Sequence, residues 1–81
     1  MAVHAYVLVQ TEVGRASEVA AAIAGIDGVE NAENVTGPYD VIARVEGPSV
    51  DELGTLVVTR IQKVAGITRT LTCPIEGGVQ P

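Results

Sequence analysis

The sequence has few of the residues on which several classes of protein depend. Its 81 residues include one cysteine, one histidine, two tyrosines and neither tryptophan nor phenylalanine. A single cysteine excludes a disulfide scaffold within the chain. Five lysines and arginines stand against ten acidic residues, which gives a net charge of −5. The chain therefore lacks the basic surface that binds a phosphate backbone, and we expect no direct contact with nucleic acid.

Long apolar segments are missing as well. No apolar run reaches the roughly 18 residues of a membrane-spanning helix, and no basic-then-apolar leader opens the chain. We therefore expect no membrane partner and a cytoplasmic location. With 47% hydrophobic and 19% charged residues, the composition is that of a globular protein. We expect one domain over residues 1–75 and a flexible C-terminal tail over residues 76–81.

Apolar residues alternate along four segments and recur every three to four residues along two others. The expected strands are residues 5–11, 28–36, 39–47 and 67–73, and the expected helices are residues 14–25 and 49–66. The first and third strands are apolar on both faces, which is typical of central strands, and the other two have a polar face. The order βαββαβ predicts a ferredoxin-like α+β sandwich, with an antiparallel sheet of order 4-1-3-2 and both helices on one face.

Two local patterns refine this fold. The spacing of apolar residues in the second strand indicates an edge strand with a bulge. Ser49 and Glu52 have the form of a capping box, in which Ser49 caps the second helix and Glu52 reaches back to the Ser49 amide. Leu56 and Val58 lie outside the apolar arc of that helix and suggest a second contact surface. The arc itself is expected to bury Val50, Leu53, Val57, Ile61 and Val64.

With both helices on one face, the other face of the sheet is left open. We expect it to carry Tyr6, Leu8 and Ile42 and a threonine stripe of Thr68, Thr70 and Thr72. Leaving large apolar side chains in water forgoes about 1.5–3 kcal/mol for each of them, which is a large share of the stability of a small domain. We therefore expect a homodimer that packs sheet to sheet.

The residues able to support catalysis or bind a metal are scattered. His4 has no cluster of metal ligands near it in the sequence, and Cys73 is expected to be a small packing residue with no base beside it. Glu30 and Glu33 are three positions apart on a strand, so we expect them on opposite faces and not as an acid/base pair. No catalytic residue, metal or cofactor is expected.

The turn TGPYD, residues 36–40, carries more than a chain reversal needs. Gly37 and Pro38 are enough for a hairpin, in which case Tyr39 is a strand residue and Asp40 a solvated carboxylate. Alternatively, Gly37 lets a ligand approach the backbone and Asp40 pairs with a cation. With the hydroxyls of Thr70 and Thr72, these groups are the ones needed to hold the ammonium and carboxylate of an amino acid. Spacing alone leaves both interpretations open.

From Ala5 to about Ile75 the chain resembles the RAM domain (regulation of amino acid metabolism), the ligand-binding half of the Lrp/AsnC family of feast/famine regulators. The segment VTGPYDVIARVEG has the family's G-x-[YF]-D turn followed by a hydrophobic strand. The segments SVDELGTLVVTRIQKVAGI and TRTLTC follow in the family's order and spacing.

In that family the domain dimerises through its sheets, the dimers assemble into octameric or similar rings, and small effectors, usually amino acids, bind near the interface between dimers. The resemblance implies that Gly37, Tyr39, Asp40, Thr70 and Thr72 line such an effector site.

One departure from the family is large. Its regulators carry an N-terminal helix-turn-helix, whereas here the expected first strand begins about four residues from Met1. We therefore expect a stand-alone RAM protein, which senses or buffers an effector or co-assembles with full-length Lrp/AsnC regulators.

Two other functions remain open. One is an adaptor that binds no small ligand. The other is a small dimeric αβ-barrel enzyme of the monooxygenase type, which the scarcity of aromatic and histidine residues disfavours.

Overall fold

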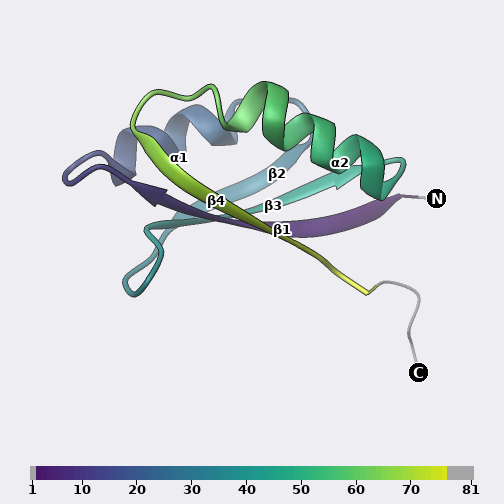
Figure 1. Cartoon of the computed structure of the whole chain (residues 1–81), viewed down its shortest axis with the longest axis horizontal. Coiled ribbons are helices and arrows are strands. Elements are labelled where there is room, and N and C mark those ends of the chain that lie inside the picture. Colours follow the sequence, from purple (N-terminus) through teal and green to yellow (C-terminus); the bar gives the residue numbers. More distant parts are fainter. Residues whose placement is uncertain (1, 77–81) are drawn as a thin grey trace.

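The computed structural model describes residues 2–76, so residues 77–81 of the expected tail lie outside it. The helices lie together on one side of a four-stranded sheet (Figure 1). Helix α2 continues directly into a π-helical segment, η1. The elements are β1 (Val3–Thr11), α1 (Ala16–Ala24), β2 (Val29–Asn34), β3 (Val41–Gly47), α2 (Val50–Leu56), η1 (Val57–Ile61) and β4 (Ile67–Pro74). No helix among residues 2–76 is long and apolar enough to cross a membrane.

All neighbouring strands of the sheet are antiparallel, and their order is β2-β3-β1-β4. This is the order 4-1-3-2 read from the other edge, so the predicted ferredoxin-like topology is confirmed. The two central strands, β1 and β3, are those whose sequences are apolar on both faces. Their helix-side residues pair directly, with Val7 opposite Ala43 and Val9 opposite Val41.

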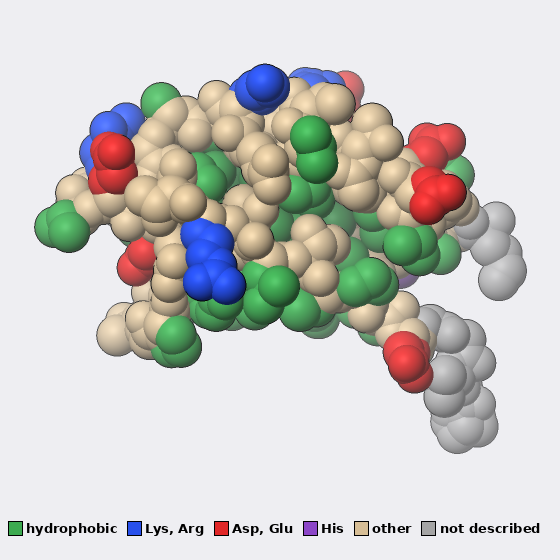
Figure 2. All heavy atoms as spheres, in the orientation of Figure 1, with side chains coloured by type: hydrophobic (Ala, Val, Ile, Leu, Met, Phe, Trp, Pro, Cys, Tyr) green, Lys and Arg blue, Asp and Glu red, His purple; other side chains and the backbone are tan. Residues whose placement is uncertain are grey.

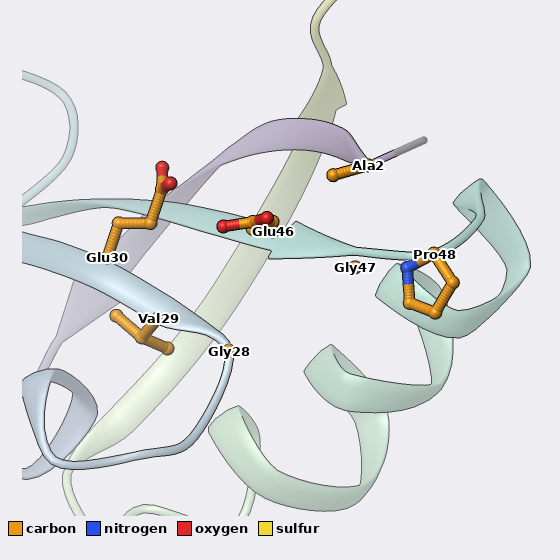
Figure 3. Close-up of a pocket in the computed structure, with 7 residues that line it drawn as sticks. All are labelled: Ala2, Gly28, Val29, Glu30, Glu46, Gly47 and Pro48. Atoms are coloured by element: carbon orange, nitrogen blue, oxygen red, sulfur yellow. The ribbon is translucent and has the colours of Figure 1, made fainter.

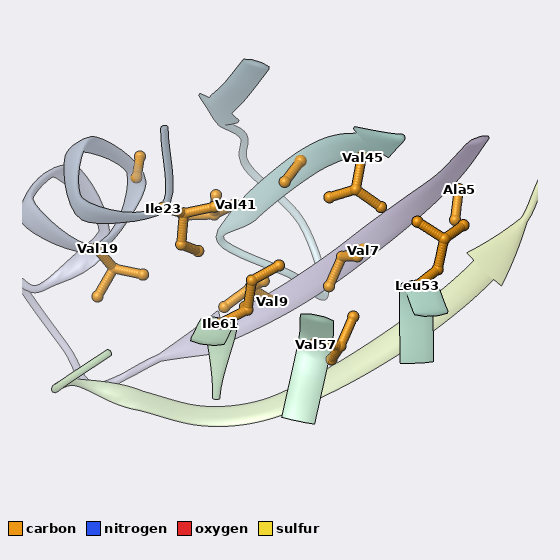
Figure 4. Packing of buried hydrophobic residues seen from close by; sticks show 12 residues of the cluster. Ala5, Val7, Val9, Val19, Ile23, Val41, Val45, Leu53, Val57 and Ile61 are labelled. Carbon is orange, nitrogen blue, oxygen red and sulfur yellow. The ribbon is translucent and has the colours of Figure 1, made fainter. Parts of the chain in front are cut away.

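The core fills the space between the helices and the sheet (Figure 4). The central strands supply one half of it, and one face of each helical segment supplies the other half. Its buried members are Ala5, Val7, Val9, Val19, Ala20, Ile23, Val41, Ala43, Val45, Leu53, Val57 and Ile61.

The second helix begins where the sequence predicts. The Ser49 hydroxyl oxygen accepts a hydrogen bond from the backbone amide of Glu52 at 3.1 Å, which caps the first turn. Leu53, Val57 and Ile61 are buried and Val64 is half-buried, as expected, but the prediction for Val50 is wrong because its side chain is 54% exposed. Leu53 packs against the end of β3 instead. Its side chain is so close to Gly47 that a Cβ added at Gly47 would lie 2.9 Å from a Leu53 methyl carbon.

Of the two residues expected to form a second contact surface on this helix, only Val58 is exposed, because Leu56 packs against the core. Leu56 is half-buried against the core, and its methyl groups pack over Gly28, whose φ is +96°. Val58 is 57% exposed. Beyond Leu56 the backbone widens into a π turn, in which the Gln62 amide donates to the Val57 carbonyl at 2.8 Å. A hydrophobic pattern read at 3.6 residues per turn does not reveal such a local widening.

The predicted bulge in the edge strand is confirmed. Along β2 the register shifts between Val29 and Asn31, so Glu30 is the extra residue opposite Arg44. This shift overturns the expectation that Glu30 and Glu33 point to opposite faces. Glu33 pairs with Ile42 on the open face, and the Glu30 carboxylate reaches Arg44 on the same face. A bulge adds one residue to one strand and thereby changes the face of every residue on one side of it.

The predicted face of the threonine stripe is wrong. Thr70 pairs with Val9 and Thr72 with Val7, and both valines are buried beneath the helices. Paired residues of an antiparallel sheet project to the same face, so these threonines lie on the helix side. Leu71 and Cys73 occupy the open face, and Cys73 is exposed. At the edge of the sheet the helix layer leaves Thr70 and Thr72 half-buried, so polar side chains are tolerated there.

The contrast between Leu53 and Val50 gives a stability test. We expect Leu53→Ala to lower the free energy of unfolding by about 2–5 kcal/mol, because it leaves a cavity against β3. We expect Val50→Ala to change it by less than about 0.5 kcal/mol, because that side chain is mostly in water. Urea unfolding at one fixed protein concentration measures both values. Equal losses in the two variants would contradict the observed packing of α2.

Candidate functional site

The open face of the sheet is apolar at its centre. Leu8 pairs with Ile42 on one side and with Leu71 on the other, and Tyr6 precedes them along β1. Leu71 is 43% exposed and Tyr6 is 42% exposed, whereas Leu8 and Ile42 are half-buried. In Figure 2 hydrophobic side chains gather along the lower margin of the molecule, on the side of the sheet away from the helices. We call these four residues the open-face patch.

The turn that carries the predicted site joins β2 to β3 and drops below the sheet on its open side (Figure 1). Gly37 is at its tip with φ of +145°, a conformation that favours glycine, and a Cβ added there would meet nothing within 4 Å. The Gln10 side-chain amide donates to the Pro38 carbonyl at 2.8 Å, which ties the turn to β1. Tyr39 is half-buried at the base of the turn.

Asp40 forms hydrogen bonds to β1 that the sequence does not reveal. Its Oδ2 accepts a hydrogen bond from the Thr11 backbone amide at 2.8 Å and lies 3.4 Å from the Thr11 hydroxyl. Its own amide donates to the Val9 carbonyl at 2.8 Å. Asp40 therefore secures the end of β1 beside the register shift at Gln10 and Thr11. These hydrogen bonds hold the carboxylate in one orientation.

The two predicted threonines lie elsewhere. The Thr70 hydroxyl accepts a hydrogen bond from the Gln62 side chain at 2.8 Å, which links β4 to the residue after η1. Thr70 also lines a shallow hollow of about 260 Å³, together with Gln62, Ile67, Thr68 and Arg69. Thr72 is half-buried one step further along the same face of β4.

The structure thus divides the predicted site into two groups. Gly37, Tyr39 and Asp40 share the β2–β3 turn, while Thr70 and Thr72 share the helix side of β4. Strand β1 lies between β3 and β4, so even where the turn enters β3, at Asp40, its backbone is about 10 Å from that of β4, or two strand spacings. Within one chain, the sheet separates the tip of the turn from the threonine hydroxyls.

A second polar group, not expected from the sequence, occupies one end of the open face. The bulge places Glu30 beside Arg44, whose Nε donates to Glu30 Oε1 at 2.7 Å. Arg44 Nη1 also donates to the Tyr6 hydroxyl at 3.1 Å, and the guanidinium lies 5.6 Å from the centre of the Tyr6 ring. His4 Nδ1 lies 3.5 Å from the same Glu30 oxygen. Glu46 pairs with His4 across the strands and completes the group.

Arg44 is the main favourable partner of Glu30 in this group. Desolvation favours a raised pKa for Glu30, but the hydrogen bond from Arg44, the nearby charge of His4, the contact with Glu46 and the charge of Arg44 together hold the pKa of Glu30 below its ordinary value. The hydrogen bonds to Glu30 and to Tyr6 raise the pKa of Arg44. Glu30 is therefore ionised at neutral pH and fixed in place. In a regular strand the Glu30 side chain would point to the other face of the sheet, and the bulge is what places it on the open face.

A hollow of about 410 Å³ adjoins the same group. Glu30 and Glu46 line it, together with glycine and proline residues near the ends of β2 and β3 (Figure 3). In Figure 3 the two carboxylates lie on the same side of the sheet. The residues that line this hollow are Ala2, Gly28, Val29, Glu30, Glu46, Gly47 and Pro48.

Known proteins match this chain in sequence and in fold. An uncharacterized HTH-type transcriptional regulator of Pyrococcus furiosus, PF0250, is 33% identical over 55 residues, which is 68% of this chain and 37% of that protein. The chain therefore spans well under half the length of this curated relative.

Two solved structures illustrate the fold. The crystal structure of TTHA0845 from Thermus thermophilus has a TM-score of 0.88 and 32% identity, with 98% of this chain and 99% of that chain covered. The transcriptional regulator NMB0573 of Neisseria meningitidis, solved as a complex with L-Met, has a TM-score of 0.80 at 15% identity, with 98% of this chain and 53% of that chain covered. At that identity the likeness shows the fold alone.

The family comparison covers nearly the whole domain. The sequence profile described as the Lrp/AsnC ligand binding domain matches residues 4–75, from the second residue of β1 to the residue after β4. The strand order, the helix layer and the turn described above all fall within that match. The chain therefore belongs to the Lrp/AsnC ligand-binding domain family, the effector-binding part of a group of transcriptional regulators.

Proposed function

We propose that this domain binds an amino acid and assembles through the open face of its sheet, as an effector-binding module of Lrp/AsnC-type regulation. The observation that carries the proposal is the one-sided layering of the fold within a chain of this family. One face of the sheet is sealed by helices, and the other presents the open-face patch to solvent.

Assembly follows from the cost of that exposed patch. Full burial of a large apolar side chain is worth about 1.5–3 kcal/mol, and Tyr6 and Leu71 are each more than two fifths exposed in the single chain. A second copy of the same sheet offers a matching apolar centre and forms a closed two-fold pair. Larger rings built from such pairs belong to the same proposal.

The division of the effector site supports binding between copies. Because the sheet separates the tip of the turn from the threonine hydroxyls, one ligand that contacts both groups must receive them from different chains. We propose that Gly37, Tyr39 and Asp40 of one copy meet Thr70 and Thr72 of another. Asp40 has the charge to pair with an ammonium group, and the threonines have hydroxyls to donate to a carboxylate.

An amino acid is the ligand class that suits these groups. The regulator NMB0573, which shares the fold, was solved with L-Met. The carboxylate of Asp40 is already oriented by Thr11, so little ordering is required when a cationic group binds it.

An adaptor without a small ligand is the second candidate. It is favoured by one observation, the hydrogen bond from the Thr11 amide to Asp40, which accounts for a carboxylate in this turn without any effector. In either role, the domain is proposed to co-assemble with full-length regulators of the family, because the relative PF0250 is an HTH-type regulator.

The proposed assembly surface is tested by charge insertion. Leu71→Glu places a carboxylate in the open-face patch, and we expect it to convert the dimer to a monomer because an unpaired charge is costly to bury. Val13→Glu is the matched control, since Val13 is 102% exposed in a loop away from the sheet face. Light scattering after size exclusion measures the masses. A dimer that survives Leu71→Glu, or dissociates equally in both variants, would refute the proposed surface.

The effector site is tested by two changes at one residue. Asp40→Asn keeps an oxygen that can accept from the Thr11 amide but removes the charge, whereas Asp40→Ala removes both. We expect calorimetry against the twenty amino acids to reveal binding by the native protein. In both variants the affinity should fall about 10-fold or more, because a hydrogen bond to a charged group is worth about 1.5–3 kcal/mol.

Stability separates the two roles of Asp40. Asp40→Asn should retain most of the free energy of unfolding, whereas Asp40→Ala should lose about 1 kcal/mol or more. Unchanged affinity in Asp40→Asn would remove Asp40 from the site. If none of the twenty amino acids binds the native protein while the dimer stays intact, the adaptor is the correct function.

A further inference from the structure

We propose that His4, Glu30 and Glu46 form a binding site for a divalent transition-metal ion such as Zn²⁺ or Co²⁺. The three residues come from three neighbouring strands, β1, β2 and β3. One ligand atom from each lies within 4.8 Å of the other two, in the part of the chain that the structure describes. This proposal is independent of the effector site, which lies at the turn and on β4.

The imidazole of His4 provides the first argument. Its Nδ1 atom is shielded from solvent and has no hydrogen-bond partner among the described residues, although the side chain as a whole is 31% exposed. The nearest carboxylate oxygen, Glu30 Oε1, is 3.5 Å away, which is too far for a good hydrogen bond. A shielded ring nitrogen without a partner is costly. A metal ion between the nitrogen and the carboxylates would satisfy it.

The fold fixes Glu30 as a ligand through two features. The bulge turns its side chain onto the open face, and Arg44 Nε binds Oε1 at 2.7 Å. The second carboxylate oxygen takes no part in that contact. Carboxylates that bind metals are commonly held by such outer hydrogen bonds. Two glutamates outweigh the single positive charge of Arg44, so the group remains net negative and attracts a cation when His4 is neutral.

The three ligand groups favour a transition metal over Mg²⁺ or Ca²⁺. An imidazole nitrogen with two carboxylates suits zinc, cobalt or nickel, whereas Mg²⁺ and Ca²⁺ prefer oxygen alone. Ligand atoms around tetrahedral zinc lie about 3.4 Å apart, so side chains whose ligand atoms lie up to 4.8 Å apart must approach by up to about 1.4 Å. Glu46 is exposed and able to make that movement. The adjoining hollow of about 410 Å³ leaves room for water at a fourth position (Figure 3).

The competing explanation is an ion-pair network without a metal. In that case a protonated His4 and Arg44 share Glu30, and the carboxylate of Glu46 simply lies nearby. The two explanations differ in what they predict for a neutral solution that contains a transition metal. Only the metal site binds one ion for each chain with defined geometry.

Co²⁺ is the most informative probe, because its visible absorption reports the coordination geometry. We expect the untagged full chain to bind one Co²⁺ at neutral pH with an absorption band that Zn²⁺ abolishes by displacement. His4→Gln and Glu46→Gln should each weaken Co²⁺ binding about 10-fold or more, since even the loss of an outer-shell contact costs about that much. An excess of Mg²⁺ should not displace the ion.

Two control variants make the test specific. Cys73→Ser removes the exposed thiol, a common adventitious metal ligand, and should leave the affinity unchanged. Glu12→Gln removes one negative charge from the opposite end of β1 and should also bind Co²⁺ normally. Circular dichroism confirms that each variant is folded. No stoichiometric Co²⁺ binding, or binding lost in Cys73→Ser but kept in His4→Gln and Glu46→Gln, would overturn the proposal.

Discussion

A single layer of helices on a four-stranded sheet is the constraint on which the rest of this structure depends. The two helical segments cover one face of the sheet, and the twelve core residues fill the space beneath them. The chain has no third helix over the other face within the described residues. The apolar side chains on that face must therefore either remain in contact with water or be covered by another molecule. Each candidate functional feature lies on the open face or at the margin of the sheet.

The open face is divided along the strands. Its centre is the open-face patch, and one end is the polar group around Glu30 and Arg44. At the other end the turn before β3 is fastened to β1 by Asp40 and Gln10. Apolar contact at the centre suits a second copy of the sheet, whereas the turn and the threonines project in different directions. The proposed function therefore connects assembly with ligand binding, because a ligand that needs both groups needs more than one chain.

Much of this architecture could be predicted from the sequence, and the failures have definite physical causes. Alternation and helical periodicity predict the strands and helices, and their order along the chain predicts the order of the strands in the sheet. Local motifs predict the bulge and the helix cap. Alternation does not say which set of residues faces the helices in an edge strand, so the pattern predicts the wrong side for Thr70 and Thr72. The bulge is predictable, but its effect on Glu30 depends on the register of pairing with Arg44. The bond between Asp40 and Thr11 joins residues 29 positions apart, and no local pattern reveals it.

The most direct test of the account is whether stability depends on protein concentration. If the open face is covered by a second copy, folding and association are coupled by mass action. The midpoint of thermal unfolding should then rise steadily over a roughly 100-fold range of concentration, and the native mass should be that of a dimer or a multiple of it. A monomeric mass with a midpoint that does not change over that range would contradict the account.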